Sequence, residues 1–150
     1  MEGVQDSEAK SGTILLLEAR TLTDDGADNE SDIIRLSPLN QIELAVNYTA
    51  GAGEAAALGK VQLFFSNDGV EFYPYAIASD SAPSGGIVTS TLYIREFSLV
   101  GVAGDAVNMW FAVPTAAKYF KVQAFEDGVI TNFGVLSVEA RLSDVSSLIF

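Results

Sequence analysis

The chain has 150 residues, of which 49% are hydrophobic, and its 20 acidic and 8 basic residues give a formal net charge of −12 at pH 7. This length suits one domain with a buried core, while the excess of acid disfavours a nucleic-acid partner, because phosphate binding requires clustered lysine and arginine. Cysteine and histidine are both absent, which excludes disulfides, thiolate nucleophiles, the usual structural zinc sites and a Ser-His-Asp triad.

The beginning of the chain is polar and contains glycine and serine, which predicts a flexible N-terminal arm over residues 1–12. This start is acidic and has no apolar segment of the kind found in signal peptides, and no run of about 18 uninterrupted apolar residues follows it. We therefore expect no signal-peptide export and no membrane-spanning helix. The next segment, Thr13–Leu22, predicts a first, largely buried strand.

The most acidic stretch of the chain is Thr23–Asp32. Its carboxylates Asp28, Glu30 and Asp32 stand at alternate positions, as the oxygen ligands of a calcium loop do. The EF-hand pattern requires glycine at the sixth loop position and glutamate at the twelfth. Counted from Asp28 as the first position, this chain has Ile33 and Leu39 there. We interpret the stretch as a solvated acidic loop and keep the three carboxylates as calcium candidates.

The following segments predict two strands and a connector. Ile33–Leu36 is a short strand that ends before Pro38, since proline cannot donate to a ladder. Gln41–Thr49 alternates apolar and polar residues throughout and predicts an antiparallel strand with one exposed face. Ala50–Gly59 is rich in small residues and lacks the Gly-Lys-Ser/Thr ending of a phosphate loop, so it predicts a flexible connector.

A hairpin is predicted over Val61–Tyr75. Alternation up to Ser66 indicates one strand, Asn67-Asp68-Gly69 supplies turn chemistry, and aromatic residues begin a second strand. The Ser79–Gly86 segment then predicts a loop.

Four further segments show strand periodicity: Ile87–Leu99, Asn108–Val113, Lys118–Phe125 and Gly134–Leu142. The pattern as a whole predicts an all-β protein, an antiparallel, jelly-roll-like β-sandwich of about eight or nine strands. We place the domain at residues 13–142, followed by a short C-terminal tail over 143–150. The tail ends in three apolar residues, Leu148, Ile149 and Phe150.

Candidate sites are few. Without histidine or cysteine, acid–base chemistry would have to rest on carboxylates, lysine, tyrosine or serine, so we expect neither an enzyme nor a cofactor. The neighbouring Glu126 and Asp127 give no support to a two-carboxylate glycosidase, because adjacent residues point apart. The aromatic residues Trp110, Tyr73 and Tyr75 are candidates for core and subunit contacts, and an exposed aromatic strip would instead stack sugar rings.

Three segments, Asp32–Gly51, Val61–Tyr73 and Ala117–Gly128, resemble small β-sandwich virion proteins of tailed bacteriophages. In that family a strand pair carries a Ser-x-Asp-Gly-x-x-Trp/Phe turn, matched here by Ser66–Phe72, which ends in phenylalanine where tryptophan is common. A later strand of the family reads Lys-Tyr-hydrophobic-Arg/Lys-Val, matched by Lys118–Val122. The turn is also similar to one in discoidin-type and other sugar-binding sandwiches.

The resemblance implies a non-enzymatic structural role in the virion, as a capsid decoration protein or another accessory protein of the head or tail. It implies a homo-oligomer, with a trimer favoured, which is made in the host cytoplasm and binds other virion proteins, the major capsid protein first among them. We expect no nucleic-acid or membrane partner, and Leu148, Ile149 and Phe150 are the expected anchors of the tail. The alternative is a carbohydrate-binding module that attaches to a host-surface glycan.

Overall fold

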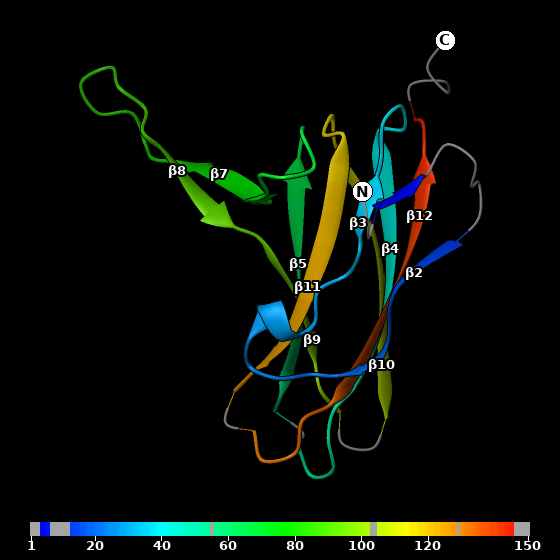
Figure 1. The fold of residues 1–150 in the computed structure, drawn as a ribbon. Helices are drawn as coiled ribbons and strands as arrows, with labels where there is room; N and C mark the ends of the chain where they lie inside the picture. The colour runs from blue at the N-terminus through cyan, green and yellow to red at the C-terminus, as the bar shows by residue number, and fades with distance from the viewer. Residues whose placement is uncertain (1–3, 7–12, 55, 103–104, 129, 146–150) are drawn as a thin grey trace.

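The computed structural model describes residues 4–6, 13–54, 56–102, 105–128 and 130–145, and residues 4–6 by their backbone alone (Figure 1). These residues form twelve strands and one turn of 3-10 helix (η1, Gly26–Asp28), and no α-helix occurs in the described ranges. The strands are β1 (Val4–Asp6), β2 (Thr13–Thr21), β3 (Ile33–Arg35), β4 (Gln41–Thr49), β5 (Leu58–Ser66), β6 (Tyr73–Pro74), β7 (Ala76–Asp80), β8 (Ser90–Ile94), β9 (Glu96–Val100), β10 (Ala106–Pro114), β11 (Tyr119–Asp127) and β12 (Val135–Ser143).

Two sheets make up the body of the molecule. One has the order β10-β4-β12-β2, and the other has the order β1-β3-β11-β5-β6 with β9 also paired to β5. Apart from β1 and from the excursion β6 to β8, successive strands of the chain alternate between the two sheets, with one exception: β5 and β9, on either side of the excursion, pair with each other in the same sheet. The resulting neighbours, β2-β12-β4-β10 and β3-β11-β5-β9, have the strand order of a double Greek key, which is the jelly roll. The predicted fold class is confirmed.

The core lies between the two sheets and follows the predicted alternation. On β4, Ile42, Leu44, Val46 and Tyr48 are all buried, and the residues between them face outward or lie half-buried. The opposite sheet contributes Val61 and Leu63 of β5 and Phe120, Val122 and Ala124 of β11, all of which are fully buried.

The strand count exceeds the sequence prediction for three reasons. The sequence predicts a flexible arm over residues 1–12, whereas β1 within it pairs in parallel with β3. β7 falls where no strand is predicted, because Ala-Ile-Ala-Ser-Asp has little of the β-branched and aromatic character of strands. The prediction of one strand over Ile87–Leu99 is wrong: the chain forms β8 and β9 on either side of Arg95, and these pair with different partners, β7 and β5.

The predicted hairpin over Val61–Tyr75 is present, with β5 paired antiparallel to β6. Its turn is held by Asp68, whose carboxylate accepts the backbone N–H of Val70 at 2.8 Å and of Glu71 at 2.9 Å and the hydroxyl of Ser66 at 2.9 Å. Gly69 has a φ of 77°, a conformation that glycine adopts without strain. Because these N–H groups stabilise the charged form, they hold the pKa of Asp68 below its usual value.

Candidate interaction surfaces

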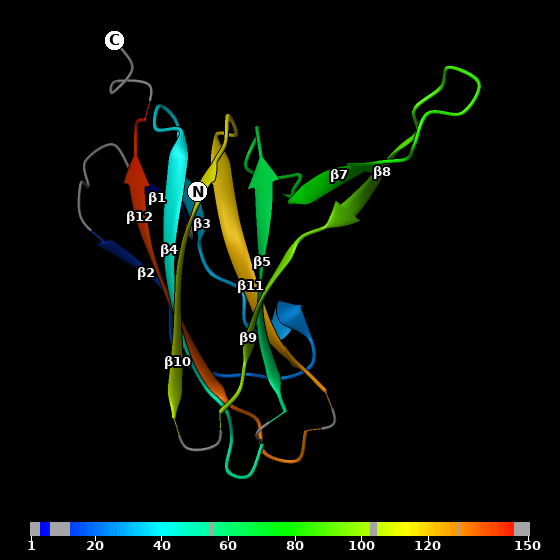
Figure 2. The ribbon, with the colours of Figure 1, turned by 180° about the vertical axis from the view of Figure 1, so that it is seen from behind.

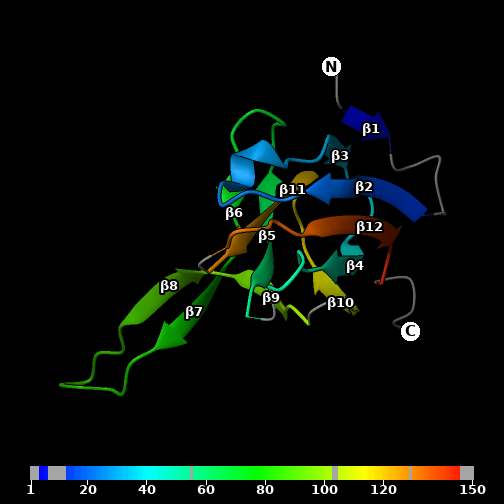
Figure 3. The same cartoon turned by 90° about the horizontal axis from the view of Figure 1, so that it is seen from below.

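The β7–β8 hairpin projects from the sandwich at the edge where β5 ends (Figures 1 and 2). The two strands leave together because the N–H of Tyr75 donates to the carbonyl of Leu63 on β5, and the N–H of Arg95 donates to the carbonyl of Tyr75, both at 2.8 Å. Beyond this point β7 pairs only with β8, and Figure 3 shows the hairpin extending away from both sheets.

All ten strand residues of this hairpin are exposed. Cross-strand partners share a face, so the pairs Ala76↔Ile94 and Ala78↔Leu92 make one face apolar next to the sandwich. The third pair of this face, Asp80↔Ser90, is polar and ends the apolar surface toward the tip. The other face carries the pair Ile77↔Tyr93. Leu92 exposes 72% of its surface, and Asp80 is the one charged residue between Ala76 and Ile94.

An arrangement of this kind suits burial against another protein. A two-stranded hairpin without a packed face is marginally stable in water, and a contiguous apolar patch on a surface marks an interaction site. Ile87 and Val88 extend the apolar surface toward the tip, where both are exposed. Exposed strand edges with so little charge are also unprotected against pairing with another chain.

A second surface, the Trp110 groove, lies on the outer face of the sheet β10-β4-β12-β2. Three neighbouring strands place Trp110, Ala45 and Glu139 in one row across this face. The small side chain of Ala45 leaves a hollow of about 430 Å³ between the tryptophan and the glutamate. An adjoining hollow of about 250 Å³ shares these three residues and is also lined by Glu43 and Arg141. Trp110 exposes 68% of its surface here.

The polar groups of the Trp110 groove are partly fixed by one another. Asn47 Nδ2 donates to Asn108 Oδ1 at 2.5 Å, which orients both amides. The Ser137 hydroxyl oxygen accepts the N–H of Ala19 at 2.9 Å, so its own hydrogen stays free to donate. The carboxylate of Glu139 forms no hydrogen bond or ion pair with the part of the chain that the structure describes.

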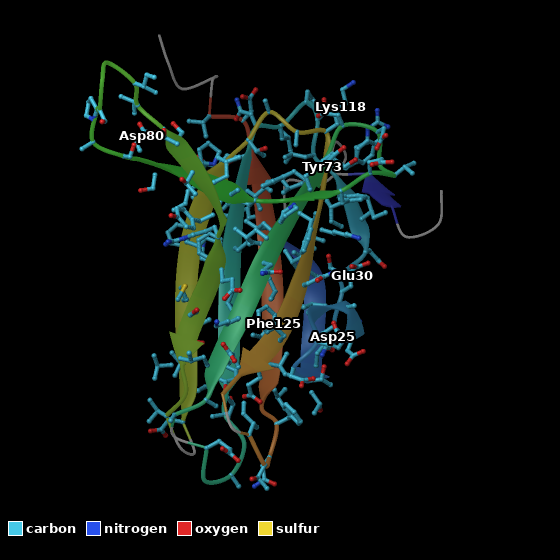
Figure 4. All side chains as sticks on the ribbon, turned by 90° about the vertical axis from the view of Figure 1, so that its left-hand side faces the viewer. Asp25, Glu30, Tyr73, Asp80, Lys118 and Phe125 are labelled. Atoms are coloured by element: carbon cyan, nitrogen blue, oxygen red, sulfur yellow. The ribbon has the colours of Figure 1, made fainter. Side chains whose placement is uncertain are left out.

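The other aromatic candidates differ from Trp110. Tyr75 is half-buried and belongs to a line of rings, in which it lies 5.8 Å from Phe65 and 6.4 Å from Phe97 between centroids. Tyr73 is exposed by 65% and lines a hollow of about 420 Å³ beside the Asp68 turn. Figure 4 shows Tyr73 at the same end of the sandwich as Lys118.

The three calcium candidates do not converge. Glu30 accepts Gln123 Nε2 at 2.6 Å and pairs with Lys121 Nζ at 3.2 Å, while Asp28 accepts the hydroxyl of Thr23 at 2.6 Å. Asp32 is exposed. No cluster of three or more histidine, cysteine, aspartate or glutamate residues suited to a metal ion occurs among the described residues.

Glu126 is a buried carboxylate that the sequence analysis did not predict. Glu126 and Asp127 do point apart, as expected: Asp127 pairs with Lys60 at 2.9 Å, whereas Glu126 lies in the core. Glu126 accepts the hydroxyl of Tyr48 and, at 2.9 Å, the N–H of Gly134. Burial and, secondly, the neighbouring Glu126 raise the pKa of Tyr48 well above its usual value. The alternation of Phe120, Val122 and Ala124 continues to position 126 and was the signal for its inward orientation.

The terminal anchor candidates Leu148, Ile149 and Phe150 lie outside the described residues. Within the described part of the chain, no helix has the length and apolar character needed to cross a membrane. Comparisons with protein-family models, with curated proteins and with solved structures give no match for this chain.

Proposed function

We propose that this chain is a non-enzymatic structural protein of a tailed-phage virion, a capsid decoration protein or another accessory protein of the head or tail. It assembles as a homo-oligomer, with a trimer favoured, and binds neighbouring virion proteins, the major capsid protein first among them. The sequence resemblance described above supports this role, and the jelly roll agrees with it, since viral capsid proteins are among the proteins built on this fold. Fold alone does not assign a function.

The observation that carries the proposal is the projecting β7–β8 hairpin. Its apolar residues have no core of their own, so their burial requires a second protein. An exposed apolar patch normally promotes aggregation. Burial of the patch in a defined assembly prevents this. A hairpin that reaches outward from one subunit is suited to clasp its neighbour, as accessory proteins of an assembled shell must do.

The charge of the chain is consistent with a role outside the nucleic acid of the particle. With a net charge of −12, its surface repels DNA. A saccharide-binding role would rest on a different surface, the Trp110 groove, and does not require the hairpin.

The oligomeric role is tested by sedimentation of the whole chain and of the double variant Leu92→Asp, Ile94→Asp. Both side chains are exposed on the apolar face of the hairpin, so the variant should keep its fold while two carboxylates oppose burial of that face. We expect the native protein at three times the 15.9 kDa chain mass and the variant at the chain mass itself. The control Val70→Asp changes an equally exposed apolar residue in the β5–β6 turn and should sediment like the native protein. A native monomer at every concentration, or a variant that assembles normally, would overturn the role of the hairpin.

The virion assignment is tested by mass spectrometry of purified particles from cells that make this chain. We expect the chain in the particles at a fixed ratio to the major capsid protein. Its presence in the lysate together with its absence from purified particles would refute the assignment, whatever its oligomeric state.

A further inference from the structure

The Trp110 groove has the exposed indole ring of Trp110 on one side and the carboxylate of Glu139 on the other, and the small side chain of Ala45 forms its floor. Along β4 it runs from Asn47 past Ala45 to Glu43, a distance of about 13 Å at the rise of an extended strand. Its larger hollow, of about 430 Å³, has the volume of a small-molecule site. Its three central residues, Ala45, Trp110 and Glu139, are all exposed.

We propose that the Trp110 groove binds an uncharged saccharide, with one sugar ring stacked on the indole of Trp110. A sugar ring has an apolar face of C–H groups and a rim of hydroxyls. The indole offers an apolar surface on which the C–H face of the sugar can stack. The other side chains of the groove offer hydrogen-bond donors and acceptors to the hydroxyls of the sugar. This assignment stands on the groove alone and does not depend on the oligomeric role of the hairpin.

The hydrogen-bonding groups fit hydroxyls, which both donate and accept. Because Asn47 Nδ2 is bonded to Asn108 Oδ1, the amide hydrogens of Asn108 and the carbonyl oxygen of Asn47 remain to face a ligand. The Ser137 hydroxyl adds a donor, and the Glu139 carboxylate adds acceptors on the wall opposite the tryptophan. The amide pair is held in place before binding, which lowers the entropic cost of ordering these groups.

Other occupants fit less well. An anionic ligand such as a nucleic acid would meet two carboxylates, those of Glu43 and Glu139, against the single guanidinium of Arg141. A cation recognised by aromatic faces is usually caged by several rings, and Trp110 is the single ring that lines the groove. An apolar protein segment would bury the carboxylate of Glu139 together with the Asn47 carbonyl oxygen and the Asn108 amide hydrogens that the Asn47–Asn108 bond leaves free, which is costly.

Trp110 is the only tryptophan of the chain, so its fluorescence reports on the groove directly. The test is a printed array of neutral oligosaccharides (glucans, mannans, galactans and xylans), followed by titration of each bound sugar while tryptophan emission is recorded. We expect saturable binding to at least one sugar, with a shift of the emission to shorter wavelength as the indole leaves water.

Two variants and a control locate the binding. Trp110→Ala, measured by calorimetry because it removes the fluorophore, removes the stacking surface and should weaken binding about tenfold or more. Ala45→Leu fills the floor, keeps Trp110, and should also weaken binding about tenfold while leaving the fold intact, because position 45 faces outward. Tyr73→Ala removes an equally exposed ring outside the groove and should bind like the native chain.

The assignment is overturned if no arrayed sugar binds, or if Trp110→Ala and Ala45→Leu both bind as the native chain does. It is also overturned if tryptophan emission stays unchanged on addition of every sugar but shifts as the protein concentration rises. Such a result would show that the groove is a contact between copies of the chain. Cleavage of a bound sugar would support binding and would contradict the non-enzymatic function, because Glu43 and Glu139 would then act as the carboxylate pair of a glycosidase.

Discussion

The sandwich and the β7–β8 hairpin use the same residue types in opposite ways. In the sandwich, strands such as β4 bury every second residue, and Leu44 is wholly buried between the two sheets. In the hairpin, β7 and β8 have equally regular pairing, yet Leu92 on β8 is exposed. Backbone pairing is thus the same in both regions, and what differs is the presence of a second layer. The sandwich holds its own core, whereas the hairpin lacks one until a partner supplies it.

The sharpest test of this difference replaces a leucine in each region. Leu44→Ala should lower the free energy of unfolding by about 2–5 kcal/mol, because it removes buried methyl groups and leaves a cavity. Leu92→Ala should change the free energy of unfolding of the monomer by less than about 0.5 kcal/mol. Urea unfolding at several protein concentrations measures both.

The concentration series separates folding from assembly. Association stabilises the folded chain by mass action, so Leu92→Ala should lose stability only at concentrations where the native chain is oligomeric. Equal losses for the two variants in dilute solution would show that the hairpin packs within its own chain.

A smaller effect is expected at the buried Tyr48–Glu126 pair, which joins β4 to β11 across the core. Tyr48→Phe keeps the ring and removes the hydroxyl that Glu126 accepts. A hydrogen bond to a charged group contributes about 1.5–3 kcal/mol, and the buried carboxylate loses one of its donors. We expect a loss of stability of that order in urea unfolding at pH 7. Tyr73→Phe, at an exposed tyrosine, should have no effect.

The same pair gives a pH dependence of known sign. Burial and Glu126 raise the pKa of Tyr48 in the folded chain, so folding favours the neutral phenol. The stabilisation is complete below the pKa of an unfolded tyrosine, about 10, and decreases as the pH rises from there through the folded pKa. The native chain should therefore lose stability above pH ~10 more steeply than Tyr48→Phe. Parallel pH profiles would show that the phenol is not protected.

The sequence predicts which side chains of a single strand are buried. It does not predict which strands pair with one another or in which register. The alternation over Gln41–Thr49 fixes which side chains of β4 are buried, and the same parity on β11 would have identified Glu126 as an inward residue. The alternation over Ile87–Leu99 is equally regular, yet nothing in it marks Arg95 as the point where the chain changes partners. The Trp110 groove depends on the register that sets Trp110 beside Ala45 and Glu139, and register between distant strands is a property of the assembled sheet.

The smallest expected effect lies at the Asp68 turn, which leads into β6 and from there into the hairpin. The backbone N–H groups of Val70 and Glu71 lower the pKa of Asp68, so the turn gains stability above the usual aspartate pKa of about 3.9 and loses it as the pH falls through the folded pKa. Acidification should therefore speed amide hydrogen exchange at positions 70 and 71, measured by NMR, while the core amides of β4 stay protected. Asp68→Asn keeps the shape without the charge and should abolish this pH dependence, whereas Asp32→Asn, at another exposed aspartate, should preserve it. If exchange in the β7–β8 hairpin follows the same titration as the turn, the turn also fixes the direction in which the hairpin leaves the sandwich, and the two regions are coupled through β6.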